Sequence, residues 1–225
     1  YTAFLADITP YVHPGRNLIF VRVNNLWNAR IAPRAGEHVF NGGIYRDVSL
    51  LVKDAVHVAW YGVRVTTPEV SRERARVVVE TEVENTGSGK AEGTLESLLL
   101  YEGKEVGRMG SRFTAGVGET AVIEQEAVIK EPELWHPDTP RLYTLISRVY
   151  RDGKPVDEAE TGFGIRWFTF TADRGFFLNG EHYEIHGANV HQDQAGWADA
   201  VTHTAIARDI AMVKECGMNF IRGSH

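Results

Sequence analysis

The end of the chain constrains its fold most strongly, because two short strand patterns flank a single amphipathic helix pattern there. The first strand is predicted over residues 183–191, with the sequence Tyr-Glu-Ile-His-Gly-Ala-Asn-Val-His, and the second over residues 218–225. The helix is predicted to begin near Thr202, which suits an N-cap, and to end before Gly217, which suits a C-cap. This order predicts a β-α-β unit, in which a right-handed crossover joins two parallel strands.

Polar side chains gather at the ends of both predicted strands. The first strand carries Asn189 and His191, with Asp193 close behind, and the second carries Arg222 and His225. Ligands bind beyond the carboxyl ends of parallel strands, and neighbouring strands lie about 4.8 Å apart. A single histidine is more often structural, but two at adjacent strand ends favour a binding role. We therefore predict that these five residues line one site.

The rest of the chain, residues 1–162, is predicted to be all β. Residues 1–53 contain two predicted strands, at 17–24 and 44–53, with a Pro- and Gly-rich connection at 32–43. Residues 54–162 show strand patterns at the spacing of a β-sandwich. These strands are predicted at 75–84, 95–101, 121–129 and 142–150. Hairpin turns are predicted at Asp152-Gly153 and, further along the chain, at Leu178-Asn179-Gly180-Glu181. The many glutamates here alternate with apolar residues, so they are interpreted as a solvated face and not as catalytic pairs.

Several aromatic and histidine side chains have a structural and a functional interpretation. Trp27, Phe40 and Tyr45 suit a sugar-binding platform, but packing at the rim of a sandwich is favoured by roughly two to one. His136 lies in a proline-bracketed turn and is interpreted as a turn residue, since no second metal ligand lies at a useful spacing. Cys216 is the single cysteine and is predicted to be a small buried residue at the helix end.

The composition is that of a soluble globular protein and limits the possible partners. The chain has 225 residues, with 43% hydrophobic and 24% charged residues and a net charge of -6. Nucleic acid is therefore not expected as a partner, and no apolar run is long enough for a membrane span. The chain opens in mid-pattern at Tyr1, so a cytoplasmic and a secreted or periplasmic location both stay open. A homo-oligomer also stays open.

Four motifs in order, at domain-sized spacing, resemble glycoside hydrolase family 2, the family of β-galactosidases, β-glucuronidases and β-mannosidases. The motifs are Gly43-Ile44-Tyr45-Arg46-Asp47-Val48, Leu134-Trp135 through Leu142-Tyr143, residues 187–191 and residues 219–225. The detailed wording of residues 42–43 and 191–197 is most similar to β-galactosidase-type members. The resemblance implies a mainly β chain in three segments. These are the C-terminal part of a jelly-roll β-sandwich (1–53), an immunoglobulin-like β-sandwich (54–162) and the first β-α-β portion of a TIM (β/α)8 barrel (163–225).

The resemblance also implies roles for the predicted site residues. His191 and His225 correspond to histidines that hydrogen-bond sugar hydroxyls, and Arg222 to an arginine that contacts the nucleophilic glutamate. Asp193 falls where related enzymes place a hydroxyl-binding acidic group, and Asn189 completes the substrate-binding set. Imidazole and guanidinium groups offer the directional donors that these roles need. The implied activity is that of a retaining exo-acting β-galactosidase in carbohydrate metabolism.

The catalytic carboxyl groups are expected outside this chain. A retaining glycosidase needs two, about 5–5.5 Å apart, and in this family both are glutamates of later barrel strands. They are expected after His225, so the chain alone is expected to be inactive. Glu181 and Glu184 are placed at the base of the first strand and within it, whereas Asp193 and Asp199 are candidates to face the site.

No cofactor is expected to be required within this chain, and sodium or magnesium is expected only as an option in the full-length protein. Two alternatives to the β-galactosidase hypothesis stay open. One is a β-glucuronidase or β-mannosidase of the same family, and the other a non-catalytic carbohydrate-binding or structural β-sandwich module. A glucuronidase pocket should gather basic donors, and none is evident in residues 192–200.

Overall fold

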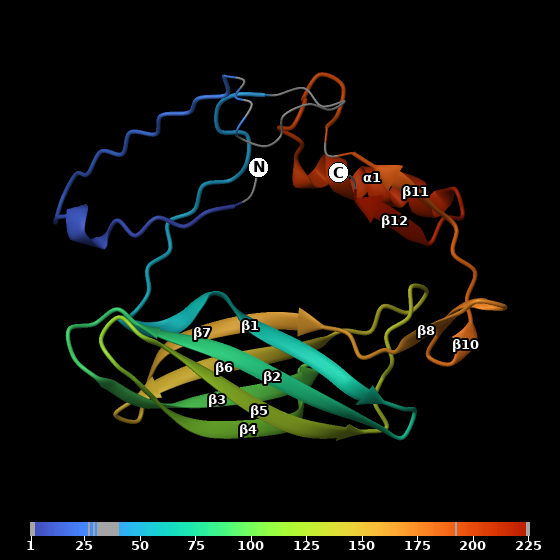
Figure 1. Ribbon diagram of the computed structural model, residues 1–225, viewed down its shortest axis with the longest axis horizontal. Coiled ribbons are helices and arrows are strands. Elements are labelled where there is room, and N and C mark those ends of the chain that lie inside the picture. Colours follow the sequence, from blue (N-terminus) through green and yellow to red (C-terminus); the bar gives the residue numbers. More distant parts are fainter. Residues whose placement is uncertain (1–2, 27, 29, 31–40, 192, 224–225) are drawn as a thin grey trace. The chain divides into compact units, whose positions relative to one another are not determined.

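The structure is a computed structural model that describes residues 3–26, 28, 30, 41–191 and 193–223 (Figure 1). The chain divides into two compact units. One consists of Leu50–Ala188 with Val213–Ile221, and the other of Tyr1–Ser49 with Asn189–Met212 and Arg222–His225. The described residues are mainly in β-strands, which confirms the predicted class. The division into segments 1–53, 54–162 and 163–225 stays a prediction.

Seven antiparallel strands form two facing sheets in the unit that contains Leu50–Ala188 (Figure 1). The first sheet has the order β1-β2-β5 and consists of β1 (Val56–Val70), β2 (Arg74–Asn85) and β5 (Thr120–Lys130). The second has the order β4-β3-β6-β7 and consists of β4 (Lys104–Ala115), β3 (Ala91–Tyr101), β6 (Tyr143–Arg151) and β7 (Lys154–Phe163). The four strands located from the sequence overlap β2, β3, β5 and β6 and are confirmed.

Alternation along each strand sends one row of side chains between the two sheets. Four residues of β2 are each 0% exposed: Val77, Val79, Thr81 and Val83. From the facing sheet, Leu99 and Leu145 join Val77 and Val79 in one buried cluster. Each buried valine or leucine of this set stabilises the fold by about 1.5–3 kcal/mol relative to an exposed one. Of the intervening glutamates of β2, Glu82 is exposed and Glu80 and Glu84 are half-buried, which agrees with a face that water reaches.

Two-residue turns close the hairpins where the sequence predicts them. Asp152 and Gly153, between β6 and β7, have φ angles of 49° and 73°. Asn179 and Gly180 have φ angles of 52° and 84° and join β9 (Gly175–Leu178) to β10 (Glu181–His182). Positive φ at both central residues gives the turn a twist that matches the flanking strands, and Asn, Asp and Gly tolerate it best. The strand β8 (Phe168–Thr171) pairs with the other edge of β9.

The side chain of Tyr143 ties the 133–143 motif to the sandwich. Tyr143 begins β6 and is 2% exposed, and its ring lies against Tyr101 and Phe163 with centroid distances of 4.9 and 5.5 Å. Its hydroxyl oxygen accepts a hydrogen bond from the backbone N–H of Glu133 at 2.8 Å. Burial raises the pKa of this phenol to about 12. One side chain therefore fills the core and fixes the turn that precedes its strand.

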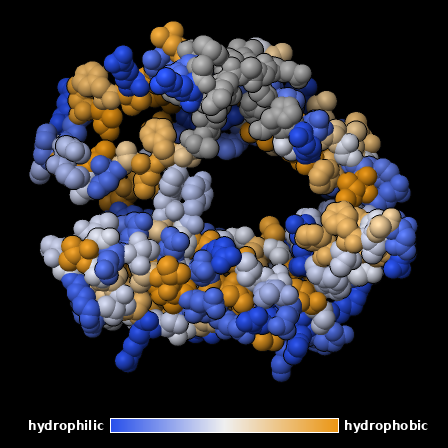
Figure 2. Space-filling model, viewed as in Figure 1, coloured by the Kyte–Doolittle hydropathy of each residue, from blue (hydrophilic) through white to orange (hydrophobic). Residues whose placement is uncertain are grey.

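The two strands predicted in residues 1–53 are wrong. The described part of this segment contains the 3-10 helix η1 (Thr9–Tyr11), but residues 17–24 and 44–53 form no strand. Apolar side chains of the first stretch are exposed, with Phe20 at 88% and Leu18 at 70%. Figure 2 shows apolar residues at the surface in the region where Figure 1 draws this blue segment. A strand needs a neighbour for its backbone N–H and C=O groups, and the described residues supply none there.

Replacing Tyr143 by Phe is expected to lower the free energy of unfolding by about 1–2 kcal/mol, because the N–H of Glu133 loses its acceptor. Urea denaturation of the 225-residue chain, followed by near-UV circular dichroism, measures this change. Tyr150→Phe is the matched control, since its hydroxyl lies at the longer distance of 3.5 Å from the Glu96 carboxylate. Equal effects of the two substitutions would contradict the role assigned to Tyr143.

The raised pKa of Tyr143 also predicts a pH dependence. The folded state favours the neutral phenol, so this contribution to stability is fully present below pH 10 and is lost as the pH rises towards 12. Unfolding free energies measured across that window should fall more steeply for the unmodified chain than for Tyr143→Phe. Parallel curves for the two proteins would show that Tyr143 does not titrate as stated.

Candidate functional site

The end of the chain contains the predicted strand, helix and strand in the predicted order. They are β11 (Gly187–Val190), α1 (His203–Glu215) and β12 (Phe220–Gly223), and both strands are shorter than the sequence predicts. β11 and β12 are hydrogen-bonded neighbours in a two-stranded sheet (Figure 1). The neighbouring position of the strands is thereby confirmed, and their parallel direction stays a prediction.

The caps of α1 explain why the helix begins and ends where it does. The hydroxyl oxygen of Thr202 accepts a hydrogen bond from the N–H of Ala205 at 3.2 Å, which confirms Thr202 as the N-cap. Gly217 has a φ of 77° and donates its N–H to the carbonyl of Lys214 at 2.9 Å, which confirms the C-cap. The adjacent Cys216 is exposed, so its predicted burial is wrong. No residue of α1 is buried, and this lack of cover leaves Cys216 exposed as well.

Two residues of the family motifs hold β11 and β12 together. A Cβ atom at Gly187 would lie 2.5 Å from the carbonyl oxygen of Phe220, so only glycine allows this approach. Asn219 accepts a hydrogen bond from the N–H of His186 at 2.9 Å and donates one to the carbonyl of Glu184 at 2.8 Å. The first residue of each motif is therefore explained by the pairing of the two strands.

The described candidate residues stand at the ends of these strands. Asn189 lies in β11, His191 follows it directly, Asp193 lies two residues further on, and Arg222 lies in β12. All four are exposed and belong to the same compact unit. His225, the fifth residue of the predicted set, lies outside the described residues. The structure thus places four candidates on or just beyond two adjacent strands, and their contact with a sugar stays a prediction.

The β11–α1 loop, residues 193–202 of the described chain, is tied down at two points that the sequence did not reveal. Gln194 donates a side-chain hydrogen bond to the Asp209 carboxylate of α1. The carboxylate of Asp199 accepts a hydrogen bond from the Asn41 amide at 2.7 Å, and its backbone carbonyl accepts one from Arg46. Asp199 is 3% exposed, so the expectation that it faces a ligand is wrong: its carboxylate is buried against Asn41.

The remaining candidate carboxylates and histidine have structural roles in the described residues. Glu181 lies in β10 and accepts a hydrogen bond from Arg72 at 2.6 Å. Glu184 precedes β11, which corrects its placement within the strand, and its carboxylate lies 3.7 Å from the ring of His186. The ring of His136 accepts a hydrogen bond from the N–H of Asp138 at 3.2 Å, as expected of a turn residue.

The aromatic platform receives little support from the residues that can be described. Tyr45 is half-buried, and the guanidinium of Arg46 lies 5.5 Å from the centre of its ring. Trp27 and Phe40 lie outside the described residues. Within the described part of the chain, no group of three or more His, Cys, Asp or Glu side chains is arranged to hold a metal ion.

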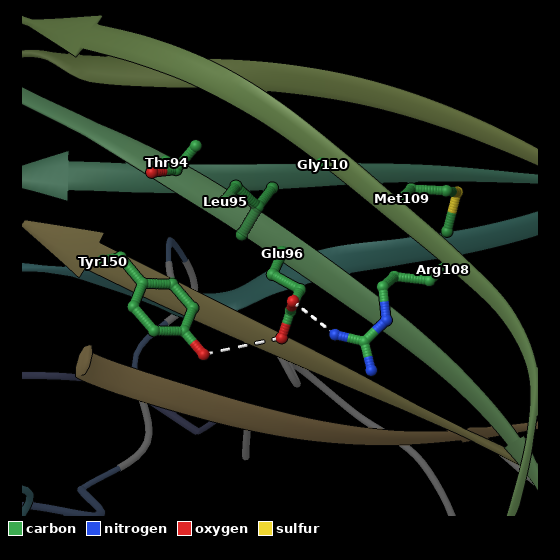
Figure 3. A pocket seen from close by; sticks show the side chains of 7 residues that line it. All are labelled: Thr94, Leu95, Glu96, Arg108, Met109, Gly110 and Tyr150. Atoms are coloured by element: carbon green, nitrogen blue, oxygen red, sulfur yellow. Dashed lines mark hydrogen bonds and ion pairs between the residues drawn. The ribbon is translucent and has the colours of Figure 1, made fainter. Parts of the chain in front are cut away.

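A pocket of about 430 Å³ lies on the sandwich (Figure 3). Its lining residues belong to 94–150, and none of them is a predicted binding residue. The Glu96 carboxylate accepts hydrogen bonds from Arg108 at 2.6 Å and from the Tyr150 hydroxyl at 3.5 Å. The charged groups of this pocket are therefore paired with one another, which leaves them poorly placed to bind a charged ligand. We do not assign the functional site to it.

Comparison with known proteins identifies the class. Residues 56–166 match the model of the family described as Glycosyl hydrolases family 2. The whole chain is 36% identical to Beta-galactosidase BoGH2A of Bacteroides ovatus and 34% identical to a Beta-glucuronidase of Bacteroides fragilis. The structure matches Bacteroides uniformis beta-glucuronidase 2, covalently bound to cyclophellitol-6-carboxylate aziridine, with a TM-score of 0.87 and 35% identity over 97% of this chain.

The chain therefore belongs to glycosyl hydrolase family 2, the family that the four sequence motifs resemble. The chain spans 26% and 33% of the two curated relatives and 27% of the solved structure. A further structure of the Bacteroides uniformis enzyme is described as a calcium binding mutant. Among the residues described, no helix is both long and apolar enough to cross a membrane.

Replacing Asn219 by Ala is expected to loosen the pairing of β11 and β12, since two backbone groups lose their partners at roughly 1 kcal/mol each. Hydrogen exchange of the backbone amides in residues 186–190 of the full-length protein measures the loosening. Asn219→Asp is the matched control, because it keeps the acceptor for His186 and loses only the donor to Glu184. Unchanged exchange in Asn219→Ala would show that this side chain does not hold the strands.

Proposed function

We propose that the protein containing this chain is a retaining, exo-acting glycoside hydrolase that hydrolyses terminal β-D-galactosides. The observation that carries the proposal is the position of Asn189, His191, Asp193 and Arg222 on or just beyond two hydrogen-bonded strands. Similarity to family 2 enzymes along the whole chain supports it. We also propose the division into jelly-roll, immunoglobulin-like and barrel segments that the sequence motifs imply.

The proposed roles follow from the chemistry of each group. Sugar hydroxyls both donate and accept hydrogen bonds, so His191, Asn189 and Asp193 between them offer donors and acceptors for neighbouring ring positions. Arg222 presents a planar, permanently charged donor that fits a carboxylate, which suits a contact with the nucleophilic glutamate. The acid/base and nucleophile glutamates of the retaining mechanism are proposed to follow His225 in the full-length protein.

A β-glucuronide is the second candidate substrate, because the Bacteroides fragilis and Bacteroides uniformis relatives are named as β-glucuronidases. It differs from a galactoside in carrying a carboxylate at C6. The stretch of residues 192–200 contains two aspartates and no lysine or arginine. An exposed Asp193 would repel a sugar carboxylate, and this observation favours the galactoside.

Metal dependence and assembly are proposals about the full-length protein. Sodium or magnesium would be held by oxygen ligands, and the structure described as a calcium binding mutant of the Bacteroides uniformis enzyme supports looking for a hard cation. A homo-oligomer and a cytoplasmic, secreted or periplasmic location are equally compatible with the described residues.

Substituting His191 by Ala or His225 by Ala in the full-length protein is expected to lower kcat/KM on an aryl β-galactoside by about 10- to 100-fold each. The reason is that each change removes hydrogen bonds to a sugar hydroxyl, worth about 1.5–3 kcal/mol. Steady-state kinetics and a thermal unfolding curve of each variant separate this effect from a loss of folded protein.

His203→Ala is the matched control, because its side chain is 94% exposed at the start of α1 and should leave the kinetics unchanged. The same protein is assayed on aryl β-glucuronides and β-mannosides. Faster hydrolysis of a glucuronide would replace the galactoside assignment. Tight galactoside binding without hydrolysis of any glycoside would support the non-catalytic module instead.

A further inference from the structure

The 41–46 segment, Asn-Gly-Gly-Ile-Tyr-Arg, contacts the β11–α1 loop with both of its ends. At one end the Asn41 amide donates to the buried Asp199 carboxylate at 2.7 Å. At the other, Arg46 donates to the backbone carbonyl of Asp199 and also to that of Val201 at 3.4 Å. The segment and the loop belong to one compact unit, although 158 residues separate Asn41 from Asp199 in the sequence.

The two glycines of the segment shape it for this contact. Gly43 has a φ of 88°, a left-handed conformation in which a side chain is strained. A Cβ atom at Gly42 would lie 2.9 Å from the side-chain nitrogen of Asn25, so a side chain at this position would displace that of Asn25. The chain bends at Gly43, and Asn41 before the bend and Arg46 after it contact the same loop.

Asp199 is the residue on which this contact depends. Its exposure of 3% means that the carboxylate has left water, and such a group costs several kcal/mol unless hydrogen bonds replace its hydration. The Asn41 amide supplies a hydrogen bond to that carboxylate without adding a second charge. A buried, partnered carboxylate is specific in geometry, so it fixes the loop at one place.

Hydrogen bonds within the loop connect Asp199 to the residues before it. The N–H groups of Trp197 and Ala198 donate to the carbonyl of Gln194 at 3.1 and 2.8 Å, and that of Ala200 donates to the carbonyl of Trp197 at 3.0 Å. The Gln194 side chain in turn is held by Asp209 of α1. Asp193 begins this ordered loop, so its position depends on both attachments.

We propose that Asn41, Arg46 and Asp199 are positioning residues for the sugar-binding end of β11. The 41–46 segment holds the β11–α1 loop through Asp199 and thereby sets the place of Asp193 relative to a bound sugar. This inference rests on the proposed function, since it assigns the loop to a glycoside site. It extends that function by making a segment at the other end of the chain part of the machinery that orients the substrate.

An exchange of the two hydrogen-bonding groups tests the proposal in the full-length protein. Asn41→Asp sets two carboxylates against each other in a buried site and should release the loop. Asp199→Asn keeps an acceptor for Asn41 but loses the charged partner, so it should release the loop less than Asn41→Asp does. In the double variant, Asn41→Asp with Asp199→Asn, the amide and the carboxylate change places and the hydrogen bond returns. The variants are compared at pH 8, so that the two carboxyl groups of Asn41→Asp do not avoid repulsion by sharing a proton.

Two readouts are taken from each variant. Hydrogen exchange of the amides in residues 193–202 reports on the loop, and Asn41→Asp should raise it by at least about tenfold. Kinetics on the best aryl glycoside report on the site, and kcat/KM should fall by about 10²-fold with a raised KM, as expected of a displaced binding group. The double variant should return both values to within about threefold of the unmodified protein.

The outcomes distinguish positioning from a merely structural role. Partial unfolding would lower kcat through the amount of active protein and leave KM unchanged, which would overturn the proposal. A released loop with unchanged kinetics would also overturn it, without touching the proposed function. Failure of the double variant to recover would overturn the Asn41–Asp199 pairing.

Arg22→Ala, an exposed arginine in the same compact unit, is the control and should change neither readout. If the unmodified protein hydrolyses no glycoside, the proposed function fails and the catalytic part of this inference fails with it. The exchange data then still decide whether Asn41 holds the loop, so the two failures remain distinguishable.

Discussion

The structure depends on one requirement of β-strands: each needs hydrogen-bonded neighbours along its edges and cover for its apolar face. The sandwich of β1 to β7 meets both conditions, because two antiparallel sheets bury their inner rows against each other. Val77 and Leu145 come from different sheets, yet both are 0% exposed in one cluster. The 133–143 motif depends on this packing as well, because Tyr143 is buried between the sheets and its hydroxyl binds the backbone N–H of Glu133.

The same requirement explains where the expectations for the first 53 residues fail. Residues 17–24 have the alternation of a strand, and they adopt no ladder in the described chain. The alternation of apolar and polar residues indicates which face of a strand would be buried. It does not show whether another strand pairs with it or whether another layer covers that face. The helix α1 differs in this respect. Its caps at Thr202 and Gly217 were predicted correctly from the sequence, although none of its residues is buried. A local signal was thus sufficient for the helix ends, whereas the alternation of a strand was confirmed only where a neighbouring strand pairs with it.

Some residues of the candidate site are close in the chain, whereas the residues that hold its loop in place come from a distant segment. Asn189, His191 and Asp193 follow one another, and their relation to Arg222 was predictable because a β-α-β pattern makes the two strands neighbours. The attachment of the loop to Asn41 and Arg46 was not predictable, since these residues have no spacing that relates them to Asp199. A buried aspartate near a proposed ligand is easily mistaken for a ligand-binding group, and only its hydrogen-bond partner corrects that interpretation.

The sequence by itself determined the class of the chain, the strands β2, β3, β5 and β6, the turns at 152–153 and 179–180, and both caps of α1. The turns and caps depend on residues near one another in the chain, the strands were located by their apolar alternation, and the class was indicated by distinctive motifs. Only the tertiary structure decided that residues 17–24 lack a sheet partner, that Cys216 is exposed and that Asp199 is buried against Asn41. Burial and pairing between distant segments are properties of the whole packed molecule, so no local pattern in the sequence records them.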